Sequence, residues 1–215
     1  MLRFALVPVV AGLVLAGTWV TGGLITDDFR LAMGLTLLWF VVAGLAALWV
    51  GWRWRRLAMP IVGAYLVTAV AAGGYLAYAS MVDKVVNETV AVAAATASAT
   101  GAEADSPQQN VALAEGSFKS GEHPTSGRAS LIRLAAGGRV LTLTDFGTSP
   151  GPDLRVYLVS GTTDELGDVV DLGGLKGNKG NQQYELPDGL DVRSHRTVVI
   201  WCRAFSVPFG SAKLA

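Results

Sequence analysis

Three long apolar runs fill the first third of the sequence, and shorter alternating runs fill its last half. The long runs cover about residues 4–25, 31–51 and 57–82, and none of them contains Lys, Arg, Asp, Glu or His. Each run has roughly 20 residues or more, which is enough for a helix to cross a hydrocarbon core about 30 Å thick. The pattern therefore predicts three transmembrane α-helices.

The short connections between these runs differ in charge. The segment WRWRR (52–56) places three arginines between the second and third runs, whereas TDDFR (26–30) is net acidic. The positive-inside rule assigns the arginine-rich connection to the cytoplasm, together with Arg3 and the amino terminus. Since two further spans follow the first run, we interpret it as a retained helix and not as a signal peptide. We expect a multi-pass protein of the cell membrane whose carboxy-terminal domain is extracytoplasmic.

The predicted spans lack the side chains that move ions, protons or electrons through a bilayer. Both histidines of the chain follow the spans, so the sequence excludes a transmembrane haem that is held by two histidines. Small residues at Gly12/Ala16 and Gly73/Ala77 have the spacing that lets membrane helices pack closely. Residues 1–84 are therefore predicted to be a three-helix anchor in the lipid bilayer.

The next segment, residues 85–112, is rich in Ala, Thr and Ser and contains no aromatic residue. Such a composition cannot bury enough apolar surface to fold alone. We expect the third helix to continue to about residue 95 and a flexible linker to follow it. A separate domain is then predicted over residues 113–215.

Short runs with alternating polarity characterise this last domain. In LRVYLVS (154–160), Leu154, Val156 and Leu158 alternate with more polar positions, as in a half-buried strand. RVLTLTDF, ASLIRLA, DVVDLG, QQYELP and TVVIWCRAF are further candidates. Roughly seven short strands without amphipathic helices between them predict an all-β fold, either an antiparallel sandwich or a small barrel.

The only cysteine, Cys202, lies in the last of these strands, VVIWCRAF. Alternation places Cys202 on one face with Ile200 and Ala204, and since both faces are mainly apolar we expect a central strand that is covered on two sides. Pro208 is expected to end its pairing. Two interpretations of Cys202 are open: a residue with redox or ligand chemistry, or a small buried hydrophobic residue, which is the usual role of an unpaired thiol.

Charge and motifs exclude several functional classes. The 17 basic residues balance the 17 acidic ones, so no overall field favours nucleic acid as a partner. No G-x-S-x-G, H-E-x-x-H or C-x-x-C motif supports a hydrolase, a zinc protease or a thioredoxin-like enzyme. The glycine-rich GGLKGNKG (173–180) lacks the Lys-Ser/Thr ending of a phosphate loop and predicts a hairpin turn. We interpret Asp145, Asp153 and Asp171 as turn residues, and we expect no metal site.

The two histidines, His123 and His195, both lie in turn-like surroundings, GEHPTSG and RSHRT. A histidine in such a place is more often a surface or hydrogen-bonded residue than a ligand. A histidine close to Cys202 would suit thiolate or haem ligation, but the sequence does not show whether the two residues meet.

Four blocks of the domain together resemble the DM-thirteen domain family, also called the electron-transfer DM domain. They are GSFKSGEHPTSGRASLIRL (116–134), FGTSPGPDLRVYL (146–158), LGGLKGNKGNQQYELP (172–187) and VVIWCRAFSVPFGSA (198–212). The resemblance covers about residues 113–215 and implies a β-rich extracytoplasmic module. Members of the family occur beside domains thought to bind haem or to carry electrons.

The same resemblance implies a role for Cys202 as the redox residue or as a ligand to a prosthetic group. We take His123 as a candidate partner of Cys202, because a Cys–His pair would suit ligation. Haem as a cofactor follows from the resemblance alone, and the histidine-ligated membrane cytochrome of some relatives is absent here. Two functions are thus expected. The first is a redox or electron-transfer accessory module that serves a membrane or cell-surface protein. The second is a non-catalytic binding or structural module in which Cys202 belongs to the core.

Overall fold

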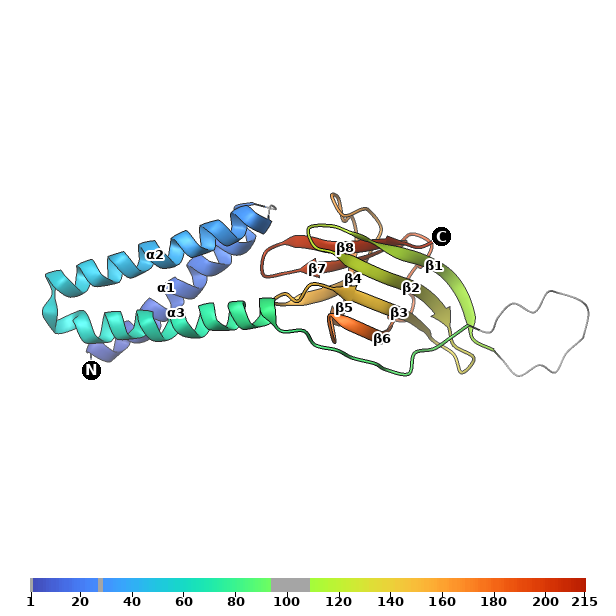
Figure 1. Ribbon diagram of the computed structural model, residues 1–215, viewed down its shortest axis with the longest axis horizontal. Coiled ribbons are helices and arrows are strands. Elements are labelled where there is room, and N and C mark those ends of the chain that lie inside the picture. The colour runs from blue at the N-terminus through green and yellow to red at the C-terminus, as the bar shows by residue number, and fades with distance from the viewer. Residues whose placement is uncertain (1, 27–28, 94–108) are drawn as a thin grey trace, which may run out of the picture. The chain divides into compact units, whose positions relative to one another are not determined.

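The computed structural model describes residues 2–26, 29–93 and 109–215 (Figure 1). The chain divides into two compact units, one formed by Met1–Val82 with Cys202–Val207 and the other by Asp83–Trp201 with Pro208–Ala215. The first unit contains the helices and a short segment of the β domain, residues 202–207, and the second contains the rest of the β domain.

Three long helices and one short 3₁₀ turn make up the helical part: α1 (Leu2–Gly23), α2 (Phe29–Arg53), η1 (Arg55–Leu57) and α3 (Ala58–Met81). Each long helix contains a segment of sufficient length and hydropathy to cross a membrane. Most large apolar side chains on these helices are exposed in the chain itself, which fits surfaces that face lipid. The prediction of three apolar helices of membrane-spanning length is confirmed.

Glycines let aromatic side chains fit between the helices. Trp39 of α2 lies over Gly17 of α1, and its indole N–H donates to the carbonyl of Val14 at 3.1 Å. Tyr65 of α3 lies over Gly44 of α2, where a Cβ would be 2.8 Å from the tyrosine hydroxyl. Small residues at these two positions therefore let a large ring from the next helix pack against the backbone.

The glycines that the sequence suggested for close packing have a different environment. A Cβ at Gly12 or Gly73 would meet no atom within 4 Å, so these positions face open space. The expectation of close packing there is wrong. A spacing of small residues shows that a helix face could pack closely. Which glycine is in contact depends on where the neighbouring helix places a large side chain.

Eight strands form the β domain: β1 (Val111–Ser120), β2 (Thr125–Arg133), β3 (Arg139–Thr148), β4 (Leu154–Val159), β5 (Val169–Gly174), β6 (Lys179–Glu185), β7 (Thr197–Cys202) and β8 (Val207–Lys213). Their order in the sheet is β5-β4-β7-β8-β1-β2-β3-β6, and the two outer strands, β5 and β6, approach each other. The result is a nearly closed antiparallel barrel filled by apolar side chains of every central strand. This confirms the predicted fold class.

Strands β1 and β8 were not among the predicted strands. The predicted last strand ends earlier than expected, at Cys202, and the chain turns through residues 203–206 into β8. Pro208 lies inside β8, so the expectation that it ends the pairing is wrong. It precedes Gly210, the first residue of β8 in register with β1, so its missing N–H removes no hydrogen bond from that pairing.

The glycine-rich segment 173–180 is not a hairpin turn, and this prediction is also wrong. Strand β5 pairs with β4 and strand β6 pairs with β3, so the segment connects the two opposite edges of the sheet. It crosses the opening between these edges. A connection between two strands does lie here, at residues 175–178, but local sequence does not show which strands it joins.

Residues 83–92, here called the strap, lie along the outer edge of β6 (Figure 1). The N–H of Val86 donates to the carbonyl of Lys179 at 2.9 Å, and the N–H of Glu88 donates to the carbonyl of Asn181 at 2.8 Å. Two ion pairs fasten the strap to the domain: Glu88 with Lys176, and Asp83 with Lys179. The strap thus satisfies backbone groups that an edge strand would otherwise expose.

The predicted extension of α3 to about residue 95 is wrong. The helix ends at Met81, and Val82 has an extended backbone with φ −101° and ψ 117°. Alanine favours a helix here, but the hydrogen bonds offered by the edge of β6 outweigh that local preference. The flexible linker expected beyond about residue 95 falls largely on residues 94–108, which lie outside the described residues. On either side of them, the Asn110 side chain donates to the Val92 carbonyl at 3.3 Å.

Replacement of Gly180 by alanine should detach the strap. Gly180 has φ +100°, and a side chain there would collide with the carbonyl of Val86 in the strap. Gly173 is a matched control, since it has φ +112° but open space around it. Gly173→Ala should cost about 1–2 kcal/mol through backbone strain alone, and Gly180→Ala should cost more. Hydrogen exchange of the strap amides should rise only in Gly180→Ala, and equal exchange in both variants would contradict this role of the strap.

Candidate functional site

Cys202 occupies the last position of β7, a strand that lies between β4 and β8. Its side chain is 0% exposed, as are those of Val198, Val199 and Ile200 in the same strand. The prediction of a central strand covered on both faces is therefore confirmed. Ala204, which was expected on the same face, belongs to the following turn and not to the strand.

An aromatic pair lies beside this cysteine along the sheet. Trp201, the residue before Cys202, is half-buried and stacks on Tyr157 of β4, with ring centroids 6.3 Å apart and an angle of 22° between the rings. Successive residues of a strand point to opposite faces, so the pair and the sulfur lie on opposite sides of β7. The sequence showed the Trp-Cys step but not Tyr157, because pairing of β4 with β7 is a property of the sheet order.

The surroundings of Cys202 do not fit a haem group. A haem ligated by this sulfur requires a cavity that reaches the sulfur, whereas the side chain is enclosed. Three hollows on the β domain are lined by neither Cys202 nor His123. Within residues 2–26, 29–93 and 109–215, no group of three or more His, Cys, Asp or Glu side chains is placed to hold a metal ion.

His123 lies in the connection between β1 and β2 and stacks on Phe209 of β8, with ring centroids 3.9 Å apart. Its backbone N–H donates to the carbonyl of Phe209 at 3.4 Å. Burial lowers the pKa of this imidazole from its ordinary value of 6.5, and the nearby charge of Glu122 opposes the shift. Stacking and burial therefore favour the neutral ring.

His195 has a different role. Its Nδ1 atom lies 3.0 Å from the carbonyl of Asp191 and 3.1 Å from the hydroxyl of Ser194, which confirms the predicted hydrogen-bonded histidine. His123 and Cys202 fall in different compact units of the chain. A joint site of these two residues stays a prediction.

A polar cluster that the sequence did not indicate lies where β6 meets the strap. Gln182 is fully buried, accepts a hydrogen bond from the Tyr184 hydroxyl at 2.7 Å and donates to the carbonyl of Gly177 at 2.8 Å. Burial raises the pKa of Tyr184 to about 12, so the phenol stays protonated. The hydrogen bonds of Gln182 and Tyr184 hold the connection between β5 and β6 in place.

Lys176 extends this cluster to the strap. Its ammonium group lies 2.8 Å from both carboxylate oxygens of Glu88 and 2.7 Å from the carbonyl of Gln183. The hydrogen bond from Lys176 lowers the pKa of Glu88, with a smaller contribution from the Gln183 amide. All these contacts hold backbone segments together, so we assign the cluster a structural role.

The burial of His123 predicts a pH dependence of stability. Because the pKa is lower in the folded state than in the unfolded state, protonation favours unfolding. The contribution of His123 is present above pH 6.5 and is lost as pH falls through its lower folded pKa. The thermal midpoint of the β domain should fall less between pH 7.5 and 5 in His123→Gln than in the unsubstituted chain. His195→Gln is the control, and an equal effect of both variants would exclude this origin.

Comparison with known proteins agrees with the resemblance seen in the sequence. Residues 117–214 match the family model described as "Electron transfer DM13", which covers all eight strands except the first residues of β1. No curated protein and no solved structure matched the chain. The carboxy-terminal domain of this chain is therefore a DM13 domain.

Proposed function

We propose that this chain is a membrane-anchored redox module in which an extracytoplasmic DM13 domain exchanges electrons through Cys202. The match to the electron-transfer family supports the class of function. One structural observation carries the choice of residue: the only cysteine is buried in a central strand next to the stacked Trp201–Tyr157 pair. Thiol, indole and phenol groups can each lose one electron in a protein.

The burial of Cys202 favours transfer of an electron over attack by another thiol. Thiol–disulfide exchange requires an attacking thiolate to reach the sulfur, and a side chain with 0% exposure blocks that approach. One-electron oxidation of Cys202 releases its proton and leaves a thiyl radical, while the electron crosses β7 to the stacked Trp201 and Tyr157 rings on the other side of the strand. The acceptor in this proposal is a redox-active protein in the membrane or at the cell surface.

The same burial also favours a second function, a binding or structural module without redox chemistry. Cys202 shares its strand with three fully buried aliphatic residues, which is the ordinary setting of a thiol that acts as a small hydrophobic residue. In this case the DM13 domain presents its surface to another protein or to a surface polymer, and the sulfur contributes only to packing.

Voltammetry of the full chain in a lipid film separates the two functions. Under the redox proposal the protein shows an oxidation wave that Cys202→Ala removes and that Trp201→Phe weakens. Under the structural alternative Cys202→Ala leaves the voltammogram unchanged. In both cases this variant should lower the stability of the β domain by about 1–2 kcal/mol, since it truncates a buried side chain. A wave that persists in Cys202→Ala would reject Cys202 as the redox residue.

The extracytoplasmic placement rests on charge. Arg53, Arg55 and Arg56 lie at the end of α2 and in η1, so the positive-inside rule places this connection in the cytoplasm. One span, α3, separates this connection from the DM13 domain, so the proposal puts the domain on the extracytoplasmic side. Protease added to intact cells, or to spheroplasts where a wall is present, should digest the domain. Inside-out vesicles should protect it, and the opposite pattern would overturn the orientation.

A further inference from the structure

Two arginines face each other at the end of the β2–β3 hairpin. Arg133, the last residue of β2, is directly opposite Arg139, the first residue of β3. Like charges in this arrangement destabilise a hairpin. In the described part of the chain neither arginine has a carboxylate within 4.0 Å, whereas Arg128 and Arg155 of the same domain pair with Glu115 and Asp171. Stability alone therefore does not account for the pair.

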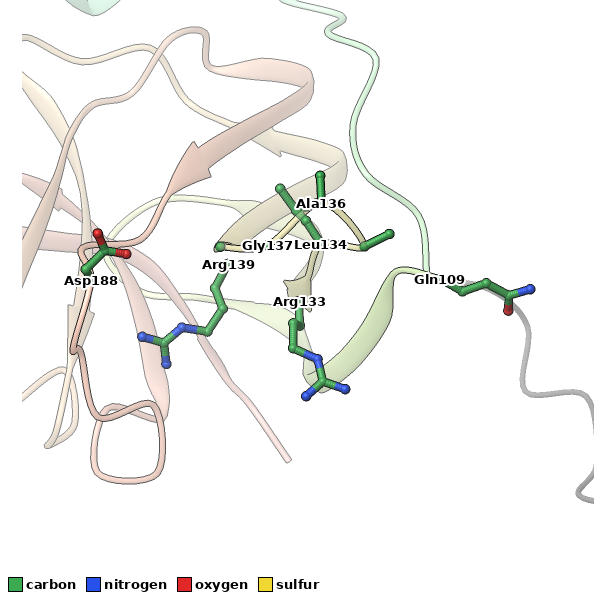
Figure 2. A pocket seen from close by; sticks show the side chains of 9 residues that line it. Gln109, Arg133, Leu134, Ala136, Gly137, Arg139 and Asp188 are labelled. Atoms are coloured by element: carbon green, nitrogen blue, oxygen red, sulfur yellow. The ribbon is translucent and has the colours of Figure 1, made fainter. Parts of the chain in front are cut away.

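The two arginines border a hollow of about 740 Å³ (Figure 2). Figure 2 shows both side chains extending in the same direction from the hairpin, with Asp188 at a distance on another connection. The turn between the strands contains Gly137 and Gly138, with φ +94° and +83°, and Leu134 is the only large side chain that it contributes to the hollow. An anion in this hollow would therefore be attracted by the charges of both guanidinium groups.

The hairpin end is held in position before any ligand binds. Nη1 of Arg139 donates to the carbonyl of Leu190 at 2.9 Å, and the amide of Ala135 in the turn donates to the side chain of Asn110 at 2.9 Å. A guanidinium group has five N–H donors, so the bond to Leu190 leaves most donors of Arg139 available. Arg133 is exposed to solvent.

We propose that Arg133 and Arg139 form a binding site for the phosphoryl group of a polyol phosphate ester. A tetrahedral phosphate has enough oxygens to accept bidentate hydrogen bonds from two guanidinium groups, whereas a carboxylate has only two oxygens. Its negative charge also relieves the repulsion between the opposed arginines. Asp188 and Gln109 line the same hollow and can accept hydrogen bonds from the hydroxyl groups of a polyol. This site is separate from Cys202 and does not depend on its redox role.

Two ligand sources share this chemistry, a soluble ester and a lipid headgroup. Calorimetric titration of the full chain in detergent micelles, with glycerol 3-phosphate in one arm and dihexanoyl phosphatidylglycerol in the other, distinguishes them. Arg133→Gln and Arg139→Gln should each weaken binding at least fivefold. Arg128→Gln removes an arginine of the same strand β2 and should change binding less than twofold. Inorganic phosphate should bind Asp188→Asn more tightly than the unsubstituted chain, because a repelling carboxylate is removed.

The thermal midpoint of unfolding distinguishes a binding role of Arg133 from a structural one, because loss of a structural residue would lower the midpoint. Arg133→Gln removes one of two opposed like charges, so its thermal midpoint should be unchanged or higher although binding is weaker. Arg133→Lys keeps the charge without the planar fork, and it should also bind more weakly. Binding in either arm that depends on both arginines supports the site and identifies the source. Absence of binding in both arms, or an equal loss in Arg128→Gln, would overturn the proposal.

Discussion

The hydrogen bonds between the strap and the edge of β6 are the constraint from which the organisation of the DM13 domain follows. A sheet that does not close completely leaves two edges, and each unpaired edge exposes backbone donors and acceptors. Here the chain itself covers the edge of β6, beginning with Asp83, two residues after the end of α3. The segment that follows α3 is therefore the first element of the β domain and not a linker in front of it.

This arrangement changes the meaning of the Ala/Thr/Ser-rich segment. Both of its described ends belong to the β unit, and the Asn110 side chain joins them by its bond to the Val92 carbonyl. Residues 94–108 are thus an insertion between the strap and β1 in the order of the chain. Its length does not change the number of residues between α3 and the strap. A change of length in this insertion is expected to be tolerated, because loop-closure entropy grows slowly with length.

The sequence predicted those features of the fold that depend on local pattern. Runs without charge predicted α1, α2 and α3, and the alternation in LRVYLVS and RVLTLTDF predicted β4 and β3. It did not predict β8, because Pro208 and Gly210 are poor strand residues by local preference. Gly210 is required by contact instead, since a Cβ there would lie 2.5 Å from the side chain of Thr125. Local pattern does not contain such information.

The candidate site also combines features that local sequence predicts with features that depend on contacts between distant segments. Alternation in VVIWC predicted the enclosed position of Cys202, because that position depends on one strand. The contacts of Tyr157 with Trp201 and of His123 with Phe209 join strands or loops far apart in the sequence, so they required the sheet order. In the same way GGLKGNKG was predicted to be a hairpin turn, whereas it connects β5 to β6, and its Lys176 forms an ion pair with Glu88 of the strap, 88 positions earlier.

Charges in this domain fall into two groups that have different physical roles. Glu88 with Lys176 and Asp83 with Lys179 fasten the strap, and Arg155 with Asp171 joins β4 to β5. Each of these pairs matches a carboxylate to a cation across two backbone segments. The opposed Arg133 and Arg139 do the reverse, since they place two positive charges together at one hairpin end. The net charge of the whole chain is zero. Local excess charge beside a hollow is a property of ligand sites, and net charge conceals it.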